Sequence, residues 1–169
     1  VVIRMFCSAA RVDLGKMRAG CLQSEDWAAL TDAAGRLSSL AIWIDDTSSI
    51  TLAALRGKAR MIARESEQAG TRLGLLVVDH ISLMAGTGRE NSVEEVVAGN
   101  SQGLHDLAKE MSIPIILLVQ LNREVEKRGK NGRPIMSDLR SSGSLEQDAD
   151  TIMFVWNPDA AAQGETQTG

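Results

Sequence analysis

The sequence has few cysteines, no long apolar run and no excess of positive charge, and each absence excludes a class of protein. Cys7 and Cys21 are the only cysteines in 169 residues, too few and too isolated for a disulfide framework or a zinc site, so we expect a reducing, cytoplasmic setting. No run approaches the roughly 18 apolar residues that span a bilayer, which argues against membrane insertion. The formal net charge of −4 argues against a surface covered in phosphate-binding groups, so any contact with nucleic acid must be local.

Short apolar runs alternate with helix-compatible segments along most of the chain. Helices are predicted over residues 1–10, from Ser24, from Thr51 to Gly70, and from Ser92 to about Met111. Strands are predicted at 41–45, 73–79, 113–119 and 151–156. This alternation predicts an α/β fold with a mainly parallel sheet covered on both sides. We expect one domain over residues 1–156, followed by a polar, flexible tail at 157–169.

The helix that begins at Ser92 contains two glycines, Gly99 and Gly103. Each costs about 1 kcal/mol relative to alanine in a helix interior. Their presence indicates close packing or a local break in that helix.

Ligands of parallel α/β sheets bind beyond the carboxyl ends of the strands, where this sequence places Asp45, Asp79, Gln120 and the region of Asp148. Asp79 follows four apolar residues in the form of a Walker B element, whose carboxylate binds the water shell of magnesium. The alternative is a strand-end aspartate that caps the next turn. Gln120 ends the next strand and is placed to contact a phosphate or a water, or to make an ordinary hydrogen bond to the loop.

The segment from Arg123 to Arg140 carries a local charge of +3, because it holds six basic residues and three acidic ones. The basic residues are Arg123, Lys127, Arg128, Lys130, Arg133 and Arg140. This segment is a candidate for contact with nucleic-acid phosphates. It contains no aromatic residue, so tracking of the backbone is expected rather than stacking on bases. The alternative is a solvated mobile loop.

Two other chemistries find little support in the residues. His80 and His105 are the only histidines, they fall on different predicted elements, and neither has a cysteine or glutamate at ligand spacing, so a zinc site is not expected. No serine lies in a G-x-S-x-G context, which disfavours a serine hydrolase of the nucleophile-elbow type.

Several blocks resemble the DnaB-type hexameric replicative DNA helicases in their order and spacing. They are LLVVDHISLM at 75–84, LAKE at 107–110, QLNR at 120–123 and SDLRSSGSLEQDAD at 137–150. The last block is long and specific. Shorter matches upstream extend the resemblance over nearly all of residues 1–156.

The resemblance implies part of a RecA-like, three-layer α/β/α motor domain, truncated on both its N-terminal and C-terminal sides. In that family six subunits form a ring, hydrolyse ATP with Mg²⁺ between neighbours, translocate on single-stranded DNA and unwind duplex DNA during replication, with primase and a helicase loader as further partners. It implies that Asp79 is the magnesium carboxylate and that Gln120 senses the terminal phosphate. Arg140, Ser141 and Gly143 would then lie on the loop that touches the phosphates of single-stranded DNA.

The sequence also departs from the family pattern. It contains no glycine-rich G-x-x-x-x-G-K-[ST] loop, and neither the family's catalytic glutamate nor its basic finger is present, so the isolated chain is not expected to hydrolyse ATP. Ser141 stands where the family usually has glutamate, and His80 is more familiar in phage relatives. The alternatives are a RecA-fold protein that binds DNA or a partner without catalysis, and a truncated prophage copy.

Overall fold

The computed structural model describes residues 1–122, 125, 133–139 and 142–157. The chain forms two compact units, Val1–Asp45 and the residues from Asp46 onward. No described helix is long and apolar enough to cross a membrane. The predicted polar tail, apart from Asn157, lies outside the described residues.

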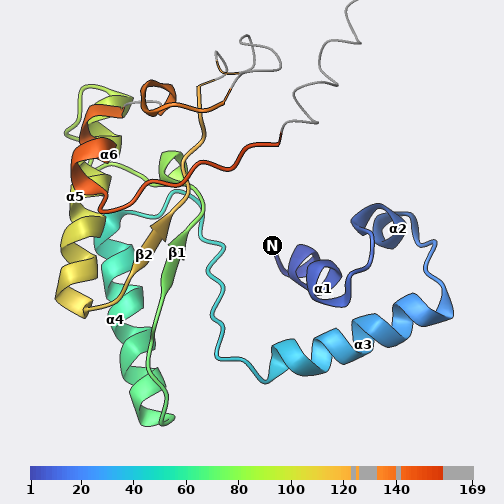
Figure 1. The fold of residues 1–169 in the computed structure, drawn as a ribbon. Coiled ribbons are helices and arrows are strands. Elements are labelled where there is room, and N and C mark those ends of the chain that lie inside the picture. The colour runs from blue at the N-terminus through green and yellow to red at the C-terminus, as the bar shows by residue number, and fades with distance from the viewer. Residues whose placement is uncertain (123–124, 126–132, 140–141, 158–169) are drawn as a thin grey trace, which may run out of the picture. The chain divides into compact units, whose positions relative to one another are not determined.

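The first unit consists of three helices: α1 (Val2–Ala10), α2 (Leu14–Ala19) and α3 (Ser24–Ser38) (Figure 1). The predictions at 1–10 and from Ser24 are confirmed, whereas the short helix α2 was not predicted. The core of this unit is small and contains Cys7, Val12, Leu30 and Ala33, which are all buried. The thiol of Cys7 donates to the sulfur of Met17 at 3.1 Å, which ties α1 to α2.

Two long helices of the second unit begin and end where the sequence predicts. The side chain of Thr51 accepts from Ala54 N–H at 3.3 Å and caps α4 (Leu52–Gln68). Gly70 follows this helix with a positive φ of 73°, a conformation that glycine adopts without strain. The hydroxyl of Ser92 caps α5 (Val93–Met111) by accepting from Glu95 N–H at 3.2 Å. Ser92 followed by Glu95 three residues later is the sequence pattern of a capping box, but the Glu95 carboxylate accepts from Asn91 N–H, one residue before the expected donor.

The sheet of the second unit contains two described strands, β1 (Leu76–Val78) and β2 (Ile115–Leu117). They are parallel, with Leu76 opposite Ile115 and Val78 opposite Leu117. Three short helices complete the described part of the unit: η1 (Ile81–Leu83), η3 (Met136–Asp138) and α6 (Ser142–Asp148). Helix α6 was not predicted from the sequence.

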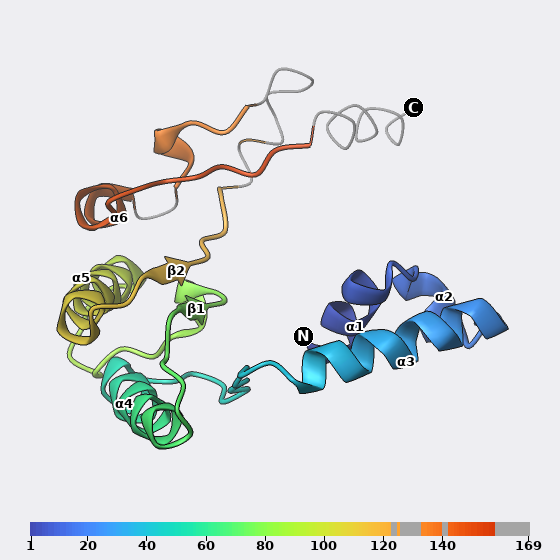
Figure 2. The same cartoon turned by 60° about the horizontal axis from the view of Figure 1, so that its bottom comes forward.

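Helices α4 and α5 lie on one side of this sheet (Figure 2). Val78, Met84 and Leu104 form one buried cluster, against which Leu52 of α4 and Ile115 of β2 pack. Ile81, Val97 and Leu145 form a second cluster, through which α6 joins η1 and α5. The other face carries the alternate residues of the strands, and Val77 and Ile116 remain 52% and 44% exposed. Within the described part of the second unit, therefore, these helices pack on one face of the sheet, as in a layered α/β fold.

Two predicted strands are wrong. Residues 41–45 and 151–156 show no strand pairing with any described part of the chain. Residues 151–157 nevertheless alternate in exposure: Val155 is 95% exposed, whereas its neighbours Phe154 and Trp156 are partly buried. An apolar run of this kind becomes a strand only where a neighbouring strand accepts and donates its backbone hydrogen bonds.

The close packing predicted for the helix glycines is confirmed at Gly103. A Cβ placed there would lie 2.0 Å from Cδ2 of Leu52. Only glycine, which has no Cβ, therefore lets α5 approach the first turn of α4 this closely. A Cβ at Gly99 would meet no described atom within 4 Å. The same two helices are also joined by ion pairs from Arg56 and Arg60 to Glu110.

Candidate functional site

Of the four positions predicted at strand ends, Asp79 and Gln120 lie at neighbouring strand tips. Asp45 follows no strand, and Asp148 is the last residue of α6. Asp79 follows β1 directly, and Gln120 follows β2 by three residues. The N–H of Leu118 donates to the carbonyl of Val78 at 2.9 Å, so the two strands remain paired up to these ends. Both side chains are exposed and make no hydrogen bond or ion pair within the described part of the chain. Their polar groups are therefore available to a ligand at the carboxyl edge of the sheet.

The chain beyond Gln120 pairs with the segment that precedes Arg140. Leu121 and Leu139 form an isolated antiparallel bridge, and Asn122 N–H donates to the carbonyl of Asp138 at 2.9 Å. Asp138 is 4% exposed, and its carboxylate accepts from Ile135 N–H at 2.8 Å, which fixes the turn of η3. Leu121 and Asn122, just after the tip of β2, are thus held beside Asp138 and Leu139.

Most of the predicted DNA-contacting residues lie outside the described residues: Arg123, Lys127, Arg128, Lys130, Arg140 and Ser141. Arg133 and Gly143 are described. The Arg133 side chain is exposed and its guanidinium carbon lies 5.1 Å from the centre of the Trp156 ring, a cation–π contact. Gly143 lies in the first turn of α6, is exposed, and has open space where a Cβ would stand.

A tight loop connects η1 to α5 and is organised around the carboxylate of Glu90. This group accepts from the N–H and hydroxyl of Thr87 and from the N–H groups of Gly88 and Arg89, at 2.9 to 3.1 Å. The backbone N–H of Thr87 contributes most to lowering the pKa of Glu90 from 4.5 to about 2. Gly86 leaves room for this arrangement, because a Cβ there would lie 2.6 Å from Glu90 Oε2. The sequence did not single out this loop.

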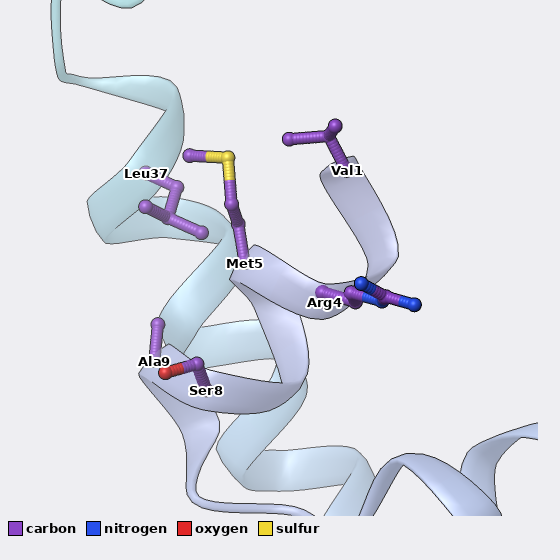
Figure 3. Close-up of a pocket in the computed structure, with 6 residues that line it drawn as sticks. All are labelled: Val1, Arg4, Met5, Ser8, Ala9 and Leu37. Atoms are coloured by element: carbon purple, nitrogen blue, oxygen red, sulfur yellow. The ribbon is translucent and has the colours of Figure 1, made fainter. Parts of the chain in front are cut away.

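The remaining titratable groups form no second site in the described residues. Nδ1 of His80 and of His105 is buried without a hydrogen-bond partner there, and no three described His, Cys, Asp or Glu side chains gather as a metal site. Both cysteines are free. In the first unit a hollow of about 480 Å³ lies between α1 and α3, where Met5 and Leu37 face each other and Arg4 points away (Figure 3). Its lining is mainly apolar and offers no catalytic group.

Solved structures of helicase ATPase domains have the same fold as this chain. A solved ATPase domain has a TM-score of 0.85 and 31% identity, covering 98% of this chain and 57% of that one. A DnaB-like replicative helicase, solved to show its interactions with primase, has a TM-score of 0.79 and 32% identity, covering 88% of this chain and 35% of the helicase. The fold is therefore the RecA-like α/β fold of helicase ATPase domains.

The family model for the DnaB-like helicase C terminal domain matches residues 1–168, and the chain belongs to this family. Replicative DNA helicase DnaB of Geobacillus stearothermophilus is 44% identical over 161 residues, which are 94% of this chain and 34% of the relative. Replicative DNA helicase DnaC of Bacillus subtilis is 40% identical over 160 residues, again 34% of its length. The chain thus spans about a third of the length of these curated relatives.

Proposed function

We propose that this chain is part of an ATP-dependent replicative helicase motor that translocates on single-stranded DNA and unwinds duplex DNA. The observation that carries the proposal is the Leu121–Leu139 bridge. One partner follows Gln120 directly and the other precedes Arg140 directly. A change at the nucleotide-facing strand tip therefore has a direct backbone route to the DNA-facing segment.

Asp79 and Gln120 supply the nucleotide side of the proposed motor. The exposed carboxylate of Asp79 suits the hydrated Mg²⁺ of a bound ATP, because this ion keeps several of its waters when it binds protein oxygens. When bound, Mg²⁺ neutralises charge on the phosphates. Asp79 would hold a water of that shell, and the Gln120 amide would donate to the terminal phosphate or to a water beside it.

Arg123, Lys127, Arg128, Lys130, Arg133, Arg140, Ser141 and Gly143 supply the DNA side. Basic residues neutralise strand phosphates without regard to sequence, and Gly143 allows the backbone to approach a phosphate closely. In the complete protein, six copies form a ring around one DNA strand and meet primase and a loader, as the resemblance to DnaB-type helicases implies. We place the protein in the cytoplasm.

Domain replacement tests the proposed function. Residues 1–168 replace the matching third of the Geobacillus stearothermophilus helicase, and DNA-stimulated ATP hydrolysis and strand unwinding of the ring are measured. We expect both activities, and we expect Asp79→Asn and Gln120→Ala to reduce ATP hydrolysis at least ~100-fold, a loss typical of removing one group that stabilises the transition state. Asp106→Asn on the exposed surface of α5 is the control and should leave both activities intact. An assembled ring in which Asp79→Asn hydrolyses ATP normally contradicts the assignment.

The isolated chain is expected to bind without turnover. Its sequence contains no G-x-x-x-x-G-K-[ST] loop, which in P-loop enzymes cradles the phosphates. Phosphate release from ATP by the purified chain should therefore stay at background with and without DNA. Turnover that survives purification and disappears in Asp79→Asn would show that the chain alone carries a working ATPase site.

A further inference from the structure

The basic segment lacks aromatic residues, but the fold brings one to it from elsewhere in the sequence. Trp156 lies in the 151–157 stretch and is partly buried, and the guanidinium of Arg133 covers its ring at 5.1 Å. Arg133 is exposed, so the contact between the two side chains is open to solvent on the arginine side. Contacts of this kind are weak at exposed sites, and another flat group can displace the guanidinium.

The indole nitrogen of Trp156 is the second observation. Nε1 is buried, and its N–H has no acceptor among the described residues. A buried donor without a partner is uncommon, because it has lost its water without gaining a hydrogen bond. Phenylalanine would pack and stack equally well at this position without that cost. A tryptophan here therefore suits a ligand that brings a hydrogen-bond acceptor together with a flat ring.

We propose that Trp156 is a stacking platform for one base of single-stranded DNA and that Arg133 covers the platform when no strand is bound. This proposal rests on the proposed DNA-binding function and adds a base contact to it. A nucleotide supplies both features, since its base is flat and its phosphate oxygens accept hydrogen bonds. The net charge of +3 between Arg123 and Arg140 favours a polyanionic strand over a neutral aromatic ligand.

When a DNA strand binds, the Trp156 ring loses its contact with Arg133 and gains a contact with a base. The base takes the place of the guanidinium on the Trp156 ring, and Arg133 moves to a phosphate of the same strand. The indole N–H donates to an acceptor of the nucleotide. Every base has a π face, so the platform tolerates any sequence and agrees with a motor that moves along DNA.

The test uses tryptophan emission of the full chain. The chain has three tryptophans and no tyrosine, so Trp27→Phe with Trp43→Phe leaves Trp156 as the only strong emitter. A 20-residue oligothymidine should quench its emission, whereas an abasic strand of the same length should bind without quenching. In the otherwise unchanged chain, Trp156→Leu should weaken oligothymidine binding about 10-fold, within the range for loss of one stacked base, and leave abasic binding unchanged. Trp27→Leu, a change of an exposed tryptophan in the first unit, should alter neither.

Anisotropy of labelled strands follows binding independently of tryptophan. If oligothymidine binds but Trp156 emission does not change, or if Trp156→Leu weakens abasic and thymidine strands equally, the platform is wrong and the proposed DNA binding stands. If neither strand binds, both proposals fail. Quenching by ATP and not by oligothymidine assigns the ring to a free nucleotide and overturns the platform. Should Trp156→Leu unfold, as judged by circular dichroism, the quenching comparison still decides, and Trp156→Phe should retain most of the affinity.

Discussion

Leu121 and Leu139 pair across an antiparallel bridge, which places the residue after Gln120 beside the residue before Arg140. The bridge is supported by the Asn122–Asp138 backbone hydrogen bond and by the burial of Leu139. The segment after the tip of β2 and the segment Asp138–Leu139 are thus held side by side. This relationship links the two halves of the proposed motor within a single unit of the chain.

Removing the charge of Arg140 should weaken binding of single-stranded DNA for every sequence. Arg140→Ala should also reduce the slope of the logarithm of the binding constant against the logarithm of the salt concentration. The expected reduction is about 0.7, the contribution of one phosphate contact in a single strand. Anisotropy of labelled strands at several salt concentrations measures both quantities. Arg64→Ala, on the exposed surface of α4, removes the same charge and is the matched control. Equal effects of the two changes would remove Arg140 from the site.

Alanine at Gly143 should leave the fold intact and weaken DNA binding. The position has open space and lies in the first turn of α6, so alanine should change the free energy of unfolding by at most about 1 kcal/mol, in the stabilising direction. Loss of affinity at unchanged or raised stability would show that a phosphate approaches the backbone here. Unfolding in urea measures the free energy of unfolding, and strand binding by the same sample measures the affinity for DNA. Unchanged affinity would show that no phosphate approaches the backbone at Gly143.

Alanine at Gly103 should destabilise the protein, unlike alanine at Gly99. The new methyl group overlaps Leu52, and overpacking costs typically about 1–3 kcal/mol, only partly offset by the better helix propensity of alanine. Gly99→Ala lies in the same helix, meets no described atom, and should stabilise slightly. In a Leu52→Ala background the penalty at Gly103 should disappear, because the overlapping side chain is gone. A penalty that persists there would place the strain elsewhere.

Glu90 should titrate near pH 2. Its folded pKa lies below its ordinary value of 4.5, so its contribution to stability is fully present above about pH 4.5 and is lost as the pH falls through about 2. Glu90→Gln should therefore destabilise the loop at neutral pH and lose that disadvantage in strong acid. NMR titration of the Glu90 carboxyl carbon checks the midpoint directly. A midpoint near 4.5 would mean that the loop hydrogen bonds do not persist in solution.

The helices of this protein could be predicted from sequence because their signals are local. Thr51 and Ser92 accept hydrogen bonds from N–H groups three residues onward, and Gly70 ends a helix through its own φ. Strands depend on partners that the sequence does not reveal. Residues 73–79 and 41–45 are similarly apolar, yet only the first contains a strand, since β2 lies beside it.

In the candidate site, too, the features with local sequence signals could be predicted and the long-range contacts could not. Asp79 and Gln120 were predicted at strand ends because an apolar run followed by a polar residue is a local pattern, and the parallel pairing then brings the two tips together. The Leu121–Leu139 bridge and the Arg133–Trp156 contact join residues 18 and 23 positions apart. No periodicity marks such pairs, so only the fold reveals them. The loop around Glu90 is built on backbone N–H groups, which every residue type except proline carries, so its sequence holds no distinguishing signal.

The most direct test of the account is the salt dependence of single-stranded DNA binding by the purified chain. Anisotropy of a labelled 20-residue oligothymidine, followed from low to high salt, gives the binding constant at each concentration. We predict that the logarithm of the binding constant falls linearly with the logarithm of the salt concentration, with a slope of about 0.7 for each phosphate contacted. We also predict similar affinity for other unstructured sequences. A chain that binds no strand at low salt, or binds one with no dependence on salt, contradicts the claim that it carries the DNA-facing part of a helicase motor.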